Sequence, residues 1–207
     1  MQRLYDRYIL PKLITCACSS PPIMKQRAKI VPRAAGRVLE LGIGMGLNLS
    51  FYDPRKVDEV VGIDPSPELR QIALDAPRPA GLKVQVTEGT AEALPLDNQS
   101  FDCVVCTFTL CSVHTPDAAL AEARRVLKPG GRLLFCEHGL APDPDVAKWQ
   151  RRIEPIWKRI AGGCHLTRPI APVIAAAGFK LDWMETMYLP GSPRIAGWNE
   201  WGAALAA

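Results

Sequence analysis

The chain lacks any apolar run long enough to span a bilayer, and it lacks a strong excess of charge of one sign. Charged residues make up 22% of its 207 residues, and the net charge is +4. The lack of a long apolar run argues against a transmembrane segment. No recognised nucleic-acid motif accompanies the basic residues, so we expect no nucleic-acid partner. The start of the chain, 1–13, is amphipathic and charged rather than a signal peptide, which predicts a cytoplasmic protein.

Internal repeats, low-complexity tracts and linkers are also absent. The length suits one domain with a single core, and the 48% of hydrophobic residues is typical of a globular chain. We therefore expect one domain over residues 1–207, with no boundary between independently folded parts.

The cysteines lack the paired spacing of a metal site. Cys16 and Cys18 stand one residue apart, and no second pair follows at ligand spacing, so the prediction is no metal. A metal at Cys16 and Cys18 stays the alternative. Several of the other cysteines lie in apolar strand-like runs, where a reduced cysteine packs as a small hydrophobe.

Apolar runs alternate with helical patterns along most of the chain. We expect strands at 37–41, 59–64, 82–86, from 101, at 132–138, and in two late segments, 179–189 and 195–207. Helices are expected at roughly 66–76, 116–127 and 169–178, and two short ones within 1–33. This order predicts an α/β protein with a parallel sheet that is covered on both faces.

A long amphipathic helix is expected after residue 143. Its apolar stripe is more typical of core packing than of ligand contact. The stripe consists of Trp149, Ile153, Ile156, Trp157 and Ile160. Its basic residues favour a solvated face, with contact to an acidic surface such as anionic lipid as the alternative. These are Lys148, Arg151, Arg152, Lys158 and Arg159.

Three glycines follow the first strand in the segment Glu40-Leu41-Gly42-Ile43-Gly44-Met45-Gly46. Glycines let the backbone approach a ligand closely. The third glycine comes one residue too early for a dinucleotide loop, and Glu40 would repel a pyrophosphate. An acid at that place suits an ammonium or sulfonium group instead. Asp64 ends the second strand, where its carboxylate can accept both hydroxyls of a ribose.

This combination resembles the class I S-adenosylmethionine-dependent methyltransferases over nearly the whole chain. "LELGIGMG" matches their first motif, "VVGIDPS" their second, and "EARRVLKPGGRLLFCEH" the helix and strand that follow later. The resemblance implies a Rossmann-like doubly wound sheet with an antiparallel last strand. It also implies an N-terminal helical lid over 1–33, a cofactor-binding core over 34–142 and acceptor-side elements over 143–207. A domain that binds NAD or no cofactor at all is the weaker interpretation.

The implied cofactor is S-adenosyl-L-methionine, with S-adenosyl-L-homocysteine as its product. The adenine loop reads Thr90-Ala91-Glu92 where the family commonly has Asp-Ala-Glu, so Glu92 or the Ala91 N–H must make the adenine contact. The residues carried over to the cofactor are Glu40, Gly42, Gly44, Gly46, Asn48, Asp64, Pro65, Ala91, Glu92 and Thr107.

Four short pieces further resemble the methyltransferase-like group that includes the animal alkyl-thiol methyltransferases and bacterial relatives. They are "LCSV", "EH" at the end of the fifth strand, "WQRRIEPIWK" and "GCHLTR". Animal members carry an apolar anchoring leader, which we do not find in 1–13. The resemblance implies His138, then His165, as the group that accepts or positions the acceptor's proton. A structural histidine is the alternative for each. The implied substrate-binding residues are Leu110, Cys111, His114, Trp157 and Cys164.

The sequence thus predicts an enzyme that transfers a methyl group from S-adenosylmethionine to a small or amphipathic thiol or sulfide by in-line displacement. Methylation of a lipid amine such as phosphatidylethanolamine, or of a quinone, is the alternative, with peripheral membrane contact. A non-catalytic module that binds the cofactor is a third. Cys111 and Cys164 are expected to line the pocket rather than act as nucleophiles. The N-terminal helices form either a moving lid or a fixed cap.

Overall fold

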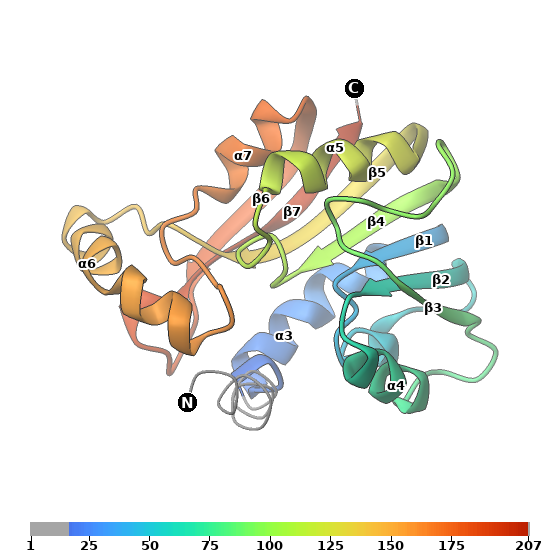
Figure 1. Ribbon diagram of the computed structural model, residues 1–207, viewed down its shortest axis with the longest axis horizontal. Helices are drawn as coiled ribbons and strands as arrows, with labels where there is room; N and C mark the ends of the chain where they lie inside the picture. Colours follow the sequence, from blue (N-terminus) through green and yellow to red (C-terminus); the bar gives the residue numbers. More distant parts are fainter. Residues whose placement is uncertain (1–16, 207) are drawn as a thin grey trace.

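A seven-stranded sheet forms the centre of the molecule (Figure 1). The computed structural model describes residues 17–206. The strands lie in the order β3-β2-β1-β4-β5-β7-β6, and β7 pairs antiparallel with β5 and β6, whereas the other pairs are parallel. The expected α/β fold with an antiparallel last strand is confirmed. The strands are β1 (Gly36–Leu41), β2 (Val57–Asp64), β3 (Val84–Glu88), β4 (Phe101–Thr107), β5 (Leu127–His138), β6 (Phe179–Tyr188) and β7 (Trp198–Ala206).

Helices cover both faces of the sheet, as Figure 1 shows. They are α3 (Pro21–Ile30), α4 (Pro67–Asp75), α5 (Pro116–Val126), α6 (Pro144–Ile160), α7 (Ile170–Ala176) and α8 (Arg194–Gly197), with short 3-10 turns at Val31–Arg33 and Leu49–Phe51. Successive residues of a strand point to opposite faces. Leu39 accordingly packs in the cluster that includes α5 and α7, and Val38 in the cluster that includes α3 and α4. The central strands β1 and β4 are buried on both sides, which explains their continuous apolar runs.

The fifth strand begins earlier than its sequence indicates. Its pairing with β4 starts at Leu127, opposite Phe101, and then jumps to Arg132, opposite Cys103. The segment Lys128–Gly131 therefore interrupts the pairing inside the strand. Gly130 has a φ of +76°, a conformation that glycine adopts readily.

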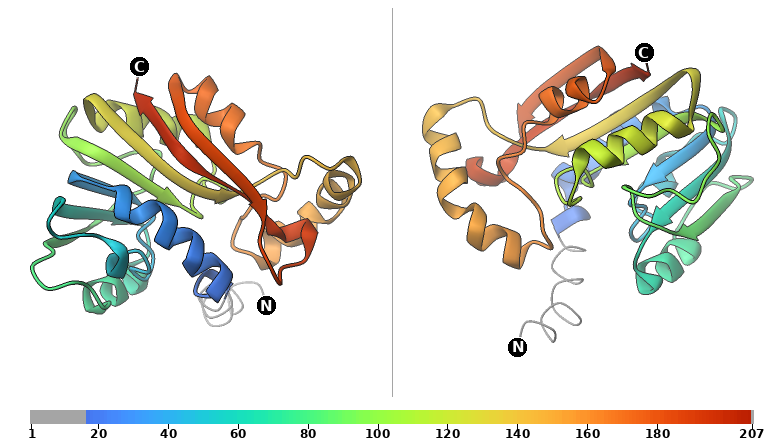
Figure 2. Two further views of the ribbon diagram at one scale, coloured as in Figure 1. Left: turned by 180° about the vertical axis from the view of Figure 1, so that it is seen from behind. Right: turned by 45° about the horizontal axis from the view of Figure 1, so that its top comes forward.

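Helix α6 stands beside one end of the sheet and not across either face (Figure 2). Its apolar stripe was expected in the core, and that prediction is wrong for three residues. Trp149 is 54% exposed, Ile156 67% and Ile160 48%, while Ile153 and Trp157 are half-buried. Periodicity indicates that a helix is amphipathic but does not say which surface covers its apolar side. No helix among residues 17–206 is both long and apolar enough to cross a membrane.

The predicted N-terminal lid is described only in part, because residues 1–16 lie outside the described part of the chain, Cys16 included. Within that part, α3 ends in Ile30, which is fully buried in the core below β1 and β4. Whether the preceding segment moves as a lid stays a prediction.

The topology gathers the candidate residues at one edge of the sheet. β1 and β4 are neighbours, and the chain winds outward from them in opposite directions. In such sheets, ligands bind beyond the carboxyl ends of the strands at this reversal point. The glycine loop follows β1, Asp64 ends β2, the segment from Phe108 to Cys111 follows β4, and His138 ends β5.

Candidate active site

The glycine loop after β1 leaves open space at its middle glycine. Gly42, Gly44 and Gly46 all have positive φ, at +66°, +54° and +74°. A Cβ added at Gly42 would lie 2.5 Å from Thr109 Oγ1, and one at Gly46 would lie 2.8 Å from the Cβ of Ala76. A Cβ at Gly44 would meet only the carbonyl oxygen of Gly42, at 3.9 Å. The outer glycines are therefore required by packing, whereas Gly44 keeps room for a ligand.

Asp64 holds this loop against β2. One carboxylate oxygen accepts the N–H of Gly44 at 3.0 Å, and the other accepts the N–H of Ser66 at 2.9 Å. Burial raises the pKa of Asp64, and these two hydrogen bonds and the charge of Arg70 oppose that rise. Each carboxylate oxygen can accept further bonds. The arrangement fits an acid that receives the two hydroxyls of a ribose.

Glu40 lies beneath the loop rather than at its surface. The side chain of Glu40 is buried, and it accepts hydrogen bonds from Asn48 Nδ2 at 2.9 Å and from the Tyr52 hydroxyl at 2.7 Å. Burial raises the pKa of Glu40 to about 7, against the lowering effect of these bonds and of Arg27. The predicted cofactor residues Glu40, Asn48 and Thr107 therefore form one buried network.

Arg27 completes that network, and sequence reasoning missed it. Its Nη1 donates to Asn48 Oδ1 at 2.8 Å and to Thr107 Oγ1 at 2.6 Å, and its guanidinium lies 5.1 Å from the centre of the Phe108 ring. Its Nε is buried and has no partner among the described residues. A buried guanidinium with a spare N–H suits a carboxylate ligand such as that of a methionine group. No motif around Arg27 signals this role.

The predicted adenine side is only partly open. Ala91 is buried, and Pro65 is exposed. Glu92 is half-buried, and one of its oxygens accepts the N–H of His114 at 3.0 Å and of Thr115 at 3.4 Å. Glu92 therefore holds the segment before α5 in place. Its second carboxylate oxygen remains available to accept a hydrogen bond from an adenine amino group.

Glu137 fixes the segment after β4, where an acceptor would enter. Its buried carboxylate accepts the N–H groups of Thr109 at 2.9 Å, Leu110 at 3.0 Å and Cys111 at 3.2 Å. Burial raises the pKa of Glu137 and the three bonds lower it. Phe108, just before them, has a φ of +54°, which is strained for a non-glycine residue. Such strain persists where surrounding contacts impose it.

Three predicted residues meet here in what we call the Cys–His–Cys cluster: Cys111, His138 and Cys164. Their nearest sulfur and nitrogen atoms all lie within 4.8 Å of one another, and His138 Nε2 is 2.8 Å from Cys164 Sγ. The pKa of the Cys111 thiol lies well above its usual range, chiefly because of a hydrogen bond with Cys164 and also because of burial. Burial lowers the pKa of His138, and the neighbouring Cys111 opposes that effect through its hydrogen bond and through the charge that it carries only as a thiolate.

The other predicted acceptor residues are not part of this cluster. The ring of His165 bonds Glu154 at 3.0 Å; burial, followed by the charge of Arg168, lowers its pKa. Leu110 is buried and Trp157 half-buried, and the indole N–H of Trp157 has no partner in the described part. His114 is exposed. The hydrogen bond between His165 and Glu154 is typical of a histidine with a structural role.

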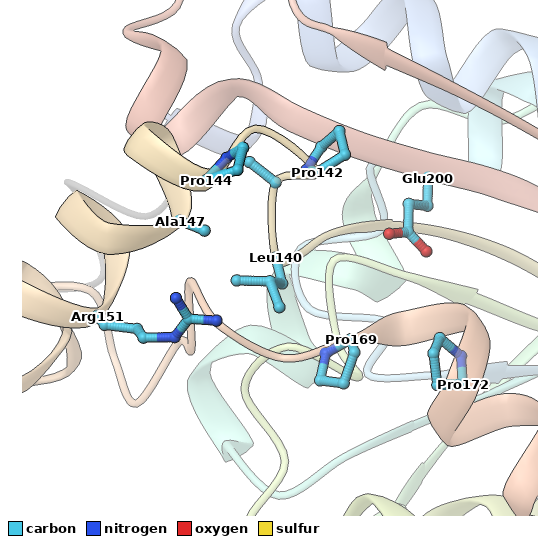
Figure 3. A pocket seen from close by; sticks show the side chains of 9 residues that line it. Leu140, Pro142, Pro144, Ala147, Arg151, Pro169, Pro172 and Glu200 are labelled. Atoms are coloured by element: carbon cyan, nitrogen blue, oxygen red, sulfur yellow. The ribbon is translucent and has the colours of Figure 1, made fainter.

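A pocket of about 480 Å³ lies nearby, between the segment after β5 and the starts of α6 and α7 (Figure 3). Its lining is mostly proline, alanine and leucine, with Arg151 and Glu200 as its charged members. It shares no residue with the glycine loop or the cluster. We assign no role in methyl transfer to this pocket.

Comparison with known proteins agrees with this geometry. A family described as "Methyltransferase domain" matches residues 39–135. A possible histamine N-methyltransferase from Thermotoga maritima has the same fold, with a TM-score of 0.64 at 22% identity over 99% of this chain and 95% of that one. A geranyl diphosphate methyltransferase solved with S-adenosylmethionine gives a TM-score of 0.67 at 13% identity, over 89% and 85% of the two chains. These two structures show the fold, and the family match together with the glycine loop identifies an S-adenosylmethionine-dependent methyltransferase.

Two curated relatives define the family more narrowly. Thiol S-methyltransferase TMT1B of Rattus norvegicus is 39% identical over 169 residues, which cover 77% of this chain and 68% of that protein. The Homo sapiens protein of the same name is 38% identical over 175 residues, which cover 79% of this chain and 71% of that protein. The chain belongs to this family of methyltransferases. Its methyl donor is S-adenosylmethionine, and the open space at Gly44, the carboxylate of Asp64 and the spare N–H of Arg27 fit that molecule.

The ribose assignment predicts that Asp64→Asn weakens binding of S-adenosylhomocysteine. Hydrogen bonds to a charged group are worth about 1.5–3 kcal/mol, so the dissociation constant should rise roughly 10- to 150-fold. Asp58→Asn, at the exposed far end of the same strand, is the matched control and should bind as the wild type does. Isothermal titration calorimetry measures both. Equal affinities for the two variants would contradict the assignment.

The buried position of Glu40 predicts a pH dependence of stability. The pKa of Glu40 is about 7 when folded and near its ordinary value of 4.5 when unfolded. The unfolded chain therefore loses this proton first, and the contribution of Glu40 to the free energy of unfolding is complete below pH 4.5 and lost as the pH rises through 7. Glu40→Gln should flatten that decline in urea titrations between pH 4.5 and 8. The control Glu185→Gln changes an exposed residue and should keep the decline in stability. Parallel curves of unfolding free energy against pH for wild type and Glu40→Gln would refute the prediction.

Proposed function

We propose that this enzyme methylates the sulfur of a small or amphipathic thiol or sulfide. The observation that carries the proposal is the 2.8 Å contact between His138 Nε2 and the sulfur of Cys164 at the acceptor edge. The site already holds a thiol against an imidazole, next to a second thiol. Sulfur is polarisable and packs well against such groups. The names of the two thiol S-methyltransferases that match the chain support the same acceptor class.

The chain's own residues would act mainly by position. S-adenosylmethionine supplies an electrophilic methyl group. The acceptor sulfur must approach that carbon from the side opposite the donor sulfur, form the new bond as the old one breaks, and lose its proton. Asp64 and the glycine loop would hold the donor, and the segment fixed by Glu137 would hold the acceptor. Alignment of this kind can supply roughly 7–11 kcal/mol of the barrier.

His138 would place the acceptor sulfur and assist its loss of a proton. A thiol has a pKa of about 8.5, so it needs only mild help to react as a thiolate near neutral pH. His138 ends β5 at the carboxyl edge of the sheet, beside the segment after β4. His165 stays a second candidate, although its ring is engaged by Glu154.

His138→Ala should lower thiol methylation roughly a hundredfold or more, because removing a positioned proton-transfer group commonly has that effect. Binding of S-adenosylhomocysteine should stay unchanged, since His138 lies on the acceptor side. The measurement is release of methylated product from a panel of small thiols, amines and phenols, followed by mass spectrometry. Exposed His114→Ala is the control, and its rate should match the wild type.

Two results would contradict this proposal, the first its assignment of His138 and the second its acceptor class. Wild-type rates in His138→Ala would exclude the histidine from the reaction. Preferred methylation of amines, phenols or quinols by the wild-type protein would exclude the thiol as the acceptor class.

A second candidate function rests on α6. Its exposed Trp149, Ile156 and Ile160 accompany five basic residues, a combination that suits the surface of an anionic membrane. The acceptor would then be a lipid amine or a quinone. A ubiquinone/menaquinone biosynthesis C-methyltransferase of Syntrophotalea carbinolica is 35% identical over 161 residues, 76% of this chain and 61% of that protein.

Sedimentation with vesicles tests this candidate. If α6 binds membranes, the protein should pellet with vesicles that contain phosphatidylglycerol and stay in solution with neutral phosphatidylcholine vesicles. Ile156→Glu should abolish the effect, because it places a negative charge in the apolar face. Ile72→Glu changes an exposed isoleucine on α4 and should not. Equal pelleting of Ile156→Glu and wild type would rule out α6 as the contact.

A further inference from the structure

We propose that the Cys–His–Cys cluster is a binding site for a zinc-type divalent metal ion, with one coordination position left for an incoming ligand. The statement that this ligand is the acceptor's sulfur rests on the proposed function above. The spacing of cysteines in the sequence predicted no metal, because the three residues are far apart in the chain and no pair among them has a metal-binding spacing.

The donor set is the first argument. Two cysteine sulfurs and one histidine nitrogen form the Cys₂His combination that catalytic zinc sites use, with an open fourth position. Harder ions such as Mg²⁺ and Ca²⁺ prefer oxygen ligands, so the sulfurs favour zinc or another thiophilic ion. Within residues 17–206, this is the one group of three potential ligands that lie close enough together.

The distances are the second argument. Zn–S bonds of about 2.3 Å and Zn–N bonds of about 2.0–2.1 Å place the ligands of a tetrahedral ion roughly 3.5–3.8 Å apart. The three ligand atoms here lie within 4.8 Å of one another, and the shortest separation, between His138 Nε2 and Cys164 Sγ, is 2.8 Å. A metal ion would need the His138–Cys164 pair to part, and the widest pair to close, by about 1 Å or less.

The supporting contacts are the third argument. Cys111 is fixed by the bond from its N–H to Glu137, and its carbonyl accepts the N–H of His165 at 2.7 Å. The second bond ties the segment that carries Cys164 to the one that carries Cys111. Arg168 adds hydrogen bonds to the carbonyls of Leu110 and Val113 between the same segments. A site preformed by contacts of this kind binds a metal without a large ordering cost.

Two of the other described cysteines, Cys103 and Cys136, show what packing alone requires. Cys103 is buried in β4, and its thiol faces the carbonyl of the next residue, Val104. Cys136 is buried in β5, and its thiol bonds Asn199. Neither belongs to a group of ligands. Cys103 and Cys136 therefore provide matched controls that remove a buried thiol outside the site.

A metal ion at this place would also serve the proposed reaction, with His138 acting through the ion that it binds instead of directly on the acceptor thiol. A thiol that coordinates a metal gives up its proton to solvent and keeps its electron pair as a thiolate. That pair can then form the bond to the methyl carbon while the donor sulfur retains the pair of the broken bond. The ion changes no oxidation state, so no further reactant is needed.

The test uses the full-length protein, reduced and stripped of metal by a chelator, and then titrated with Co²⁺. The wild type should bind one Co²⁺ per chain and develop the thiolate-to-cobalt absorption of a sulfur-ligated tetrahedral ion. Cys103→Ala should do the same. Cys111→Ala and Cys164→Ser should each lose the absorption, while circular dichroism and binding of S-adenosylhomocysteine stay as in the wild type. Added Zn²⁺ should displace the cobalt.

The outcomes separate this proposal from the proposed function. Failure of the reduced wild type to bind Co²⁺, or identical spectra in Cys111→Ala and Cys103→Ala, overturns the metal site. Full thiol methylation by metal-free protein overturns the role of the ion and leaves the thiol acceptor in place. Cobalt binding without methylation of any thiol refutes the acceptor class and leaves the metal site standing. A shift of the absorption on adding an acceptor thiol supports both.

Discussion

The proposed acceptor side of the molecule depends on one buried carboxylate. Glu137 takes three consecutive backbone N–H groups, from Thr109 to Cys111, onto its two oxygens. A buried charge is costly unless hydrogen bonds compensate it, and buried N–H groups are equally costly when left without partners. The carboxylate and the segment therefore stabilise each other. Glu137 therefore holds Cys111 toward His138 and Cys164, together with the bond from the His165 N–H to the Cys111 carbonyl.

The donor side uses the same arrangement. Asp64 ends β2 and holds the loop that follows the neighbouring strand β1, just as Glu137 lies near the end of β5 and holds the segment that follows β4. Parallel neighbours place their carboxyl ends at the same edge of the sheet, so an acid on one strand reaches the backbone beyond the next. The doubly wound order repeats this geometry on both sides of the reversal point between β1 and β4.

Local patterns in the sequence predicted the strands, the flanking helices, the glycine loop and the carboxylate at Asp64, because a few adjacent residues determine each of these features. Arg27 could not be found in that way. It bonds Thr107, 80 positions away, and nothing near it in the sequence marks the contact. The Cys–His–Cys cluster joins three distant segments, so its members were named separately, without their grouping. The exposure of Ile156 on α6 depends on what packs against the helix, which periodicity does not reveal.

The donor and acceptor sides are also joined directly, and this bears on the reaction. Thr109 Oγ1 donates to the carbonyl of Leu41 at 3.1 Å, where the glycine loop begins, and its side chain occupies the space that a Cβ at Gly42 would need. Thr107, two residues earlier, bonds Arg27 and Asn48 in the network beneath that loop. In-line displacement requires a fixed distance and angle between donor and acceptor. Because the segment from Thr107 to Cys111 contacts the glycine loop at one end and the Cys–His–Cys cluster at the other, that single stretch of backbone sets their separation. The strained φ of Phe108 lies within this stretch.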